Sequence, residues 1–103
     1  MTNQIAFKMK LKPGFKDEYK KRHDEIWPEL EELLQQAGIF NYSIFLDEET
    51  NILFAVQHLN GNTPDLTQKS IMKKWWVYMA DIMETNADQS PIAVELPRMF
   101  HLA

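Results

Sequence analysis

The chain has 103 residues, a net charge of −4 and no cysteine. Its length suits one domain with one core, and the missing cysteine excludes a disulfide framework and a thiolate nucleophile or metal site, which fits a reducing, cytoplasmic location. The scattered basic residues form no positive stripe for nucleic acid, and the longest apolar run, Ile52 to Val56, is far shorter than the roughly 20 residues that cross a membrane.

The amino-terminal segment has the pattern of a strand. From Ile5 to Lys12, apolar residues alternate with lysines, which predicts a half-buried strand and not a signal peptide. Pro13 and Gly14 end this strand.

The next segment predicts two consecutive helical pieces. Pro28 interrupts the helical pattern, and it suits the first turn of a second piece that ends near Ala37, with Gly38 as a left-handed cap. Aromatic and apolar residues at helical intervals mark the first piece, along with His23: Phe15, Tyr19, His23, Ile26 and Trp27.

The middle of the chain predicts an antiparallel hairpin. Ile39 to Leu46 alternates, the stretch Asp47 to Asn51 is turn-like, and Ile52 to Leu59 follows as another strand. Phe45 suggests that the second face of the sheet is partly covered. We expect Phe40, Tyr42, Ile44 and Leu46 on one face of the first strand, and Asn41, Ser43 and Phe45 on the other.

The carboxy-terminal part predicts a helix and a final strand. Asp65 to Met83 has apolar residues at steps of three and four, a polar loop runs from Glu84 to Pro91, and Ile92 to Leu102 contains a strand. Pro97 implies an edge position or a bulge in that strand. The loop before the helix is marked by Asn60, Gly61, Asn62 and Pro64.

The order of these elements, strand, helix, strand, strand, helix, strand, predicts an α+β fold of the ferredoxin-like βαββαβ type with an antiparallel sheet. The two helical regions can cover only one face of a four-stranded sheet, so we expect a homodimer to bury the other face.

His23 is the leading candidate for chemistry, because an imidazole exchanges protons near neutral pH. Tyr19 lies four residues earlier, so a helix places the two side chains on one face, where both could reach one ligand. The alternative is that His23, between Arg22 and Asp24, belongs to a solvated polar face. No ligand spacing relates His23 to His58 or His101, so no metal site is predicted.

The adjacent Trp75 and Trp76 point about 100° apart on a helix, so we expect one in the core and the other free to line a pocket. An indole can stack on the apolar face of a sugar ring, although an aromatic pair on a helix is commonly a packing feature. Tyr42 is open to the same two interpretations.

Together, these residues resemble the L-rhamnose mutarotase family over nearly the whole chain. The stretch from Gln57 to Lys74 carries no match. The matching features are Tyr19 with His23, the run Ile26-Trp27-Pro28-Glu29-Leu30, the run Asn41-Tyr42-Ser43-Ile44, Trp75-Trp76 followed by Tyr78, Met79 and Asp81, and the loop residues Asn86, Asp88, Ser90 and Pro91.

The resemblance implies that residues 1–103 form one mutarotase-like domain, a dimeric α+β barrel that acts as an isomerase in carbohydrate metabolism and interconverts the α and β anomers of L-rhamnose without a cofactor. It implies that His23 is the proton donor and that Tyr19, Tyr42, Trp75 and Trp76 bind the sugar. Two alternatives remain, a small cofactor-free or haem-dependent monooxygenase of the same fold and a non-catalytic dimeric binding module.

Overall fold

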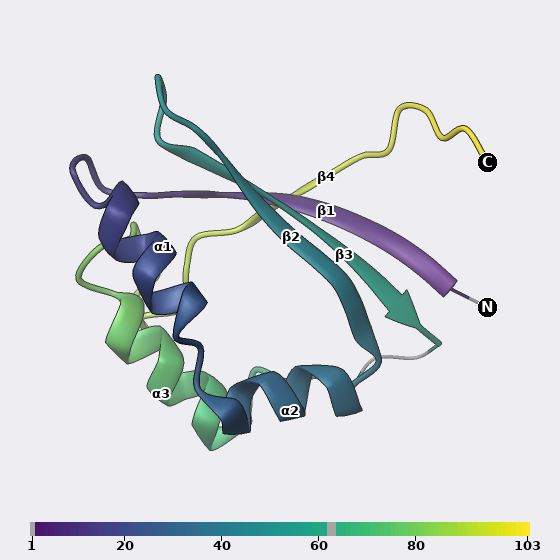
Figure 1. Cartoon of the computed structure of the whole chain (residues 1–103), viewed down its shortest axis with the longest axis horizontal. Coiled ribbons are helices and arrows are strands. Elements are labelled where there is room, and N and C mark those ends of the chain that lie inside the picture. The colour runs from purple at the N-terminus through teal and green to yellow at the C-terminus, as the bar shows by residue number, and fades with distance from the viewer. Residues whose placement is uncertain (1, 62–63) are drawn as a thin grey trace.

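Four strands form one antiparallel sheet in the computed structural model, which describes residues 2–61 and 64–103. The sheet order is β2-β3-β1-β4, and all three helices lie on one face of the sheet (Figure 1). This is the predicted ferredoxin-like fold. The strands are β1 (Thr2–Lys10), β2 (Ile39–Asp47), β3 (Ile52–Asn60) and β4 (Val94–Leu96), and the helices are α1 (Lys16–Asp24), α2 (Pro28–Gln36) and α3 (Ser70–Met79).

The core lies between the sheet and the helices. In the pairing of β1 with β3, Met9 lies opposite Leu53 and Phe7 opposite Ala55, and the alternation of each strand turns these side chains toward the helices. The predicted pattern of β1 is confirmed. The buried cluster consists of Met9, Leu11, Tyr19, Leu30, Leu53, Ala55, Trp75, Met79, Ile82 and Met83.

A β-bulge in β2 changes which side chains face the helices. Phe40 pairs with His58 and Ser43 with Val56, so Asn41 and Tyr42 together lie opposite a single residue of β3. Asn41 has φ +47°, a left-handed conformation that asparagine tolerates better than most residues. The prediction that Phe40 shares a face with Tyr42 is therefore wrong, because the extra residue reverses the alternation between them.

Pro28 and Gly38 bound α2 as predicted. Pro28 occupies the first helical turn, and Ala37 caps the end of the helix. Gly38 has φ +85°, and its carbonyl accepts a hydrogen bond of 2.8 Å from the backbone N–H of Asn60. This close approach joins the start of β2 to the end of β3.

The helix predicted over Asp65 to Met83 is shorter in the structure. At its start, the Asp65 carboxylate accepts hydrogen bonds from the Thr67 backbone and hydroxyl, which holds the chain in a turn. At its end, the Lys12 N–H donates to the Ile82 carbonyl and the Glu84 N–H donates to the Lys10 carbonyl. These long-range bonds draw the chain after Met79 toward the sheet.

The last strand is also shorter than the segment that was predicted to contain it. β4 is an edge strand beside β1, and Pro97 follows its last residue, as the prediction of an edge position requires. The tail continues away from the sheet (Figure 1). Of the residues expected in the loop after β3, Gly61 has φ +79°, while Asn62 lies outside the described residues. None of the described helices is long and apolar enough to cross a membrane.

Two glycine substitutions test the junction of β2 with β3. Gly14 and Gly38 both have positive φ, but a Cβ on Gly38 would lie 2.9 Å from the Asn60 carbonyl oxygen, whereas one on Gly14 would meet nothing within 4 Å. Gly14→Ala should lower the free energy of unfolding by about 1–2 kcal/mol from φ alone. Gly38→Ala should cost at least about 1 kcal/mol more. Urea denaturation measures both, and equal losses would contradict a role for the close approach.

Candidate active site

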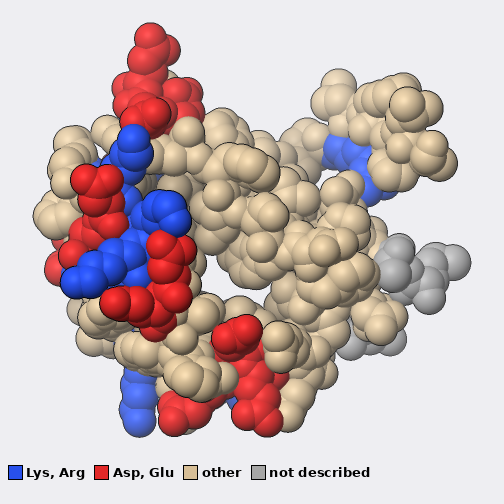
Figure 2. Space-filling model, in the orientation of Figure 1, with Lys and Arg blue, Asp and Glu red and all other residues tan. Residues whose placement is uncertain are grey.

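A cavity of about 980 Å³ separates the sheet from the helices. Charged side chains gather over α1, and the hollow is bordered mostly by uncharged side chains (Figure 2). Its apolar walls include the methionines Met9, Met72, Met79 and Met83. The volume lies near the upper end of the roughly 300–1,000 Å³ found for small-molecule sites. The fold therefore contains a largely apolar pocket in which a few polar groups can orient a ligand.

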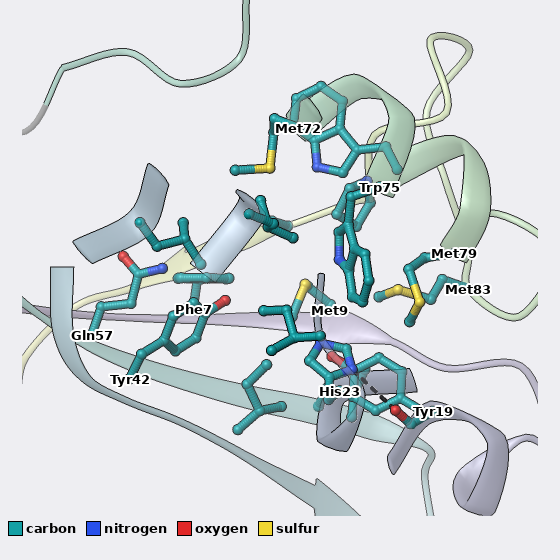
Figure 3. Close-up of a pocket in the computed structure, with 18 of the residues that line it drawn as sticks. Phe7, Met9, Tyr19, His23, Tyr42, Gln57, Met72, Trp75, Met79 and Met83 are labelled. Atoms are coloured by element: carbon teal, nitrogen blue, oxygen red, sulfur yellow. Dashed lines mark hydrogen bonds between the residues drawn. The ribbon is translucent and has the colours of Figure 1, made fainter. Parts of the chain in front are cut away.

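Tyr19 and His23 meet at one wall of this cavity. Their ring centroids are 4.2 Å apart and the rings are stacked, as the spacing of four residues on α1 predicts (Figure 3). Tyr19 is buried, and His23 is partly buried. The pair therefore faces the cavity and is not part of a solvated polar face.

A hydrogen bond defines the protonation of the neutral His23 ring. Its Nδ1 lies 3.0 Å from the Tyr19 carbonyl oxygen, and because a carbonyl only accepts, Nδ1 carries the proton. Nε2 is then free to accept a proton. Burial lowers the pKa of His23, while the bond to Tyr19 and the charge of Asp24 act in the opposite direction. The imidazole at this wall is therefore a base that is uncharged at neutral pH.

Both tryptophans of α3 line the cavity, although the sequence predicts only one in such a place. Trp75 belongs to the buried cluster and presents its ring edge-on to His23, with 5.4 Å between centroids and 87° between planes. Trp76 is partly buried and packs against the same cluster. The two indoles point about 100° apart on α3, and the cavity is wide enough to contact both of them.

Tyr42 reaches the cavity from the opposite wall. Its hydroxyl points into the cavity, with Gln57 of β3 beside it (Figure 3). Burial raises the pKa of Tyr42, and the polar side chain of Gln57 beside it acts in the opposite direction. The residue as a whole is 37% exposed, so the burial that raises this pKa concerns the hydroxyl end. Gln57 faces the helices because it alternates with Leu53 and Ala55 along β3, but a glutamine in a strand gives no sign of a lining role in the sequence.

Two buried polar groups in the cavity wall have no hydrogen-bond partner among residues 2–61 and 64–103. The Tyr19 hydroxyl and the Trp75 indole N–H both belong to side chains that are 8% exposed. Burial raises the pKa of Tyr19 well above its usual range, so its hydroxyl keeps its proton. Buried polar groups normally find partners. These two groups are therefore available to a polar ligand. In the described part of the chain, no three His, Cys, Asp or Glu side chains gather as a metal-ligand set.

Comparison with known proteins places the chain in a family. The family model described as L-rhamnose mutarotase matches residues 4–102. The L-rhamnose mutarotase of Mesorhizobium japonicum is 58% identical over 105 residues, covering 100% of both chains, and that of Bacteroides thetaiotaomicron is 56% identical over 99 residues, covering 94% and 95%. This chain belongs to the L-rhamnose mutarotase family. The crystal structure of the Formosa agariphila L-rhamnose mutarotase agrees, with a TM-score of 0.94 and 51% identity over 98% of this chain and 99% of that one.

Membership of the L-rhamnose mutarotase family confirms the resemblance drawn from the sequence. The family model also covers the segment from Gln57 to Lys74, for which the sequence offers no recognisable match. The relatives support a mutarotase and give no support to a monooxygenase or to a non-catalytic module.

The lowered pKa of His23 leads to a prediction about stability. Because folding lowers this pKa from its usual value of 6.5, the unfolded chain binds more protons than the folded chain in that range. The contribution of His23 is therefore fully present above about pH 6.5 and is lost as the pH falls through the pKa of the folded state. We expect the free energy of unfolding to fall less between pH 7.5 and 5 in His23→Gln than in the native chain. An equal fall in both would contradict the prediction.

Proposed function

We propose that this chain interconverts the α and β anomers of L-rhamnose, with His23 as its acid and base. The observation that supports this reading is the meeting of a neutral imidazole with two unpaired buried polar groups, those of Tyr19 and Trp75, in one cavity. The family of the chain supplies the identity of the sugar. The remaining steps follow from the chemistry of a hemiacetal.

Interconversion requires the sugar ring to open and close. A base removes the proton of the anomeric hydroxyl, the bond between the anomeric carbon and the ring oxygen breaks, and the ring oxygen receives a proton. The aldehyde then turns, and closure on its other face reverses these steps. Nε2 of His23 can take the first proton and return it to the ring oxygen, because both oxygens are bonded to the anomeric carbon. Proton transfers of this kind need only weak acids and bases, so the proposal includes no cofactor.

The other lining residues would bind and orient the sugar. Trp75 and Trp76 offer apolar ring faces for its C–H groups, and the Trp75 N–H is free to donate. Tyr42 lies at the wall opposite His23, so it can hold hydroxyls remote from the reacting carbon (Figure 3). Tyr19, which keeps its proton, can donate a hydrogen bond to an oxygen beside His23. The sugar is then held at both ends, and the reaction takes place at the end beside His23.

The proposal is tested by anomer exchange of L-rhamnose, measured by proton NMR with saturation transfer between the two anomeric signals. Native protein should accelerate exchange well beyond the spontaneous rate. His23→Ala should lose roughly 100-fold or more of that acceleration, because it removes the acid and base. Tyr19→Phe should lose less, since it removes one hydrogen bond and keeps the stacked ring.

His58→Ala provides a matched control, because His58 lies on β3 opposite Phe40 and does not line the cavity. This variant should keep the native exchange rate. Native protein without effect on L-rhamnose would refute the function, and a folded His23→Ala variant with full activity would refute the role of His23.

We further propose that the uncovered face of the sheet binds a second copy of the chain. Phe45 is 63% exposed and Val94 is 49% exposed on the face that points away from the helices. Exposed apolar side chains on an uncovered sheet face commonly mark an interface. Beyond β4, the tail adds Met99, Phe100 and Leu102, each at least 79% exposed.

A charge on this face should separate the two copies. Phe45→Lys is expected to shift the protein from dimer to monomer in sedimentation velocity. Val77→Lys is the matched control, because Val77 is 59% exposed on α3, away from the sheet, and it should leave the dimer intact. A native protein that sediments as a monomer at micromolar concentration would contradict the dimer.

A further inference from the structure

The Arg22 side chain joins α1 to the end of α3. Its Nη1 donates to the Tyr78 carbonyl oxygen at 2.7 Å and to Asp81 Oδ1 at 2.9 Å, and its Nη2 donates to Asp81 Oδ2 at 3.3 Å. Its Nε donates to Glu18 Oε2 at 2.7 Å within α1. The guanidinium thus forms a fork on a carboxylate and also binds a terminal helix carbonyl. Lysine, with its single ammonium group, cannot reproduce this geometry.

This ion pair differs from the others on the surface. The Arg22 side chain is only 11% exposed, although that of Asp81 is 65% exposed, whereas in the ion pair of Lys10 with Glu84 both side chains are about half exposed, 54% and 47%. Hydrogen bonds from Arg22 hold the pKa of the Asp81 carboxyl below its usual range. A forked pair with one largely covered partner loses less to water and salt than a pair with both partners exposed, so it can fix geometry.

The guanidinium is also connected to the cavity through aromatic contacts. Arg22 Cζ lies 4.5 Å from the centre of the Tyr78 ring. The centroid of that ring is 5.6 Å from Trp75, which presents its edge to His23. Arg22 is also the residue immediately before His23 on α1. One side chain therefore fixes both the helix that carries the imidazole and the indole that packs against it.

We propose that Arg22, through its fork on Asp81, is a positioning residue that holds the His23 imidazole against Trp75. Arg22 and Asp81 do not line the cavity, so their effect on the reaction acts through His23. The catalytic part of this inference rests on the proposed function. The geometric part concerns the surroundings of His23 alone and can be measured without sugar.

The test compares Arg22→Gln, Arg22→Lys and Asp81→Asn by two independent readouts. The first is the dependence of L-rhamnose anomer exchange on sugar concentration, which separates kcat from KM. The second is the NMR titration midpoint of His23 together with its proton contacts to Trp75. All three variants should lose about tenfold in kcat with little change in KM, because the imidazole is displaced while the sugar-binding groups remain. The His23 midpoint should rise, because a loosened indole admits water.

Two controls separate positioning from general stability. Glu18→Gln removes the partner within α1 and leaves the link to α3, and Lys10→Gln removes an exposed ion pair that does not include Arg22. Both should keep the native kcat and His23 midpoint. The double variant Arg22→Gln with Asp81→Asn should be no worse than either single change, since the two residues act as one unit.

The inference is overturned if folded Asp81→Asn and Arg22→Lys keep the native kcat and the native His23 midpoint, whatever their loss of stability. It is also overturned if only KM changes. If native protein fails to exchange L-rhamnose anomers, the proposed function is refuted, and the His23 midpoint and contacts alone then decide the positioning role. Arg22→Gln is the harshest of the three variants, so the milder two decide the result if it does not fold.

Discussion

The lengths of the helices and strands create the space in which the site lies. Each long strand has nine residues and spans about 30 Å, whereas a helix of nine residues spans only about 14 Å. Two helices in succession, α1 and α2, are needed to follow the length of one strand, and Pro28 sets the angle between them. The helical layer therefore changes direction between α1 and α2, and the bulky side chains of α3 separate this layer from the sheet. The cavity lies between this layer and the sheet.

The parts of the fold that depend on local pattern could be predicted from the sequence. The hairpin of β2 and β3, the break at Pro28 and the cap at Gly38 each follow from neighbouring residues. The length of α3 could not be predicted, because hydrogen bonds from residues 10–12 decide where it ends. The predicted sheet face of Phe40 is wrong for a related reason, since the extra residue of a β-bulge cannot be recognised in an alternating sequence.

The candidate site divides in the same way. Tyr19 and His23 were predicted to converge because their spacing is local to one helix, and the structure stacks them. Gln57 and the contact of Arg22 with Asp81 could not be predicted, because the residues involved meet only after the sheet and helices have assembled. The sequence therefore predicts the side chains with reactive groups, but not the side chains that hold those groups in place. Only the structure identifies such supporting side chains, since a polar residue that neighbours a histidine in the sequence is ordinarily exposed to solvent.

The four methionines around the cavity have a consequence for a ligand that exists in two shapes. An unbranched thioether side chain changes rotamer at low cost and fits irregular surfaces, unlike the stiff branched side chains that fill most cores. A catalyst that interconverts two stereoisomers must accept both without holding either too tightly. Under the proposed function, soft walls around rigid aromatic rings meet that requirement, because the walls adapt to the anomeric group while the rings hold the remainder of the sugar.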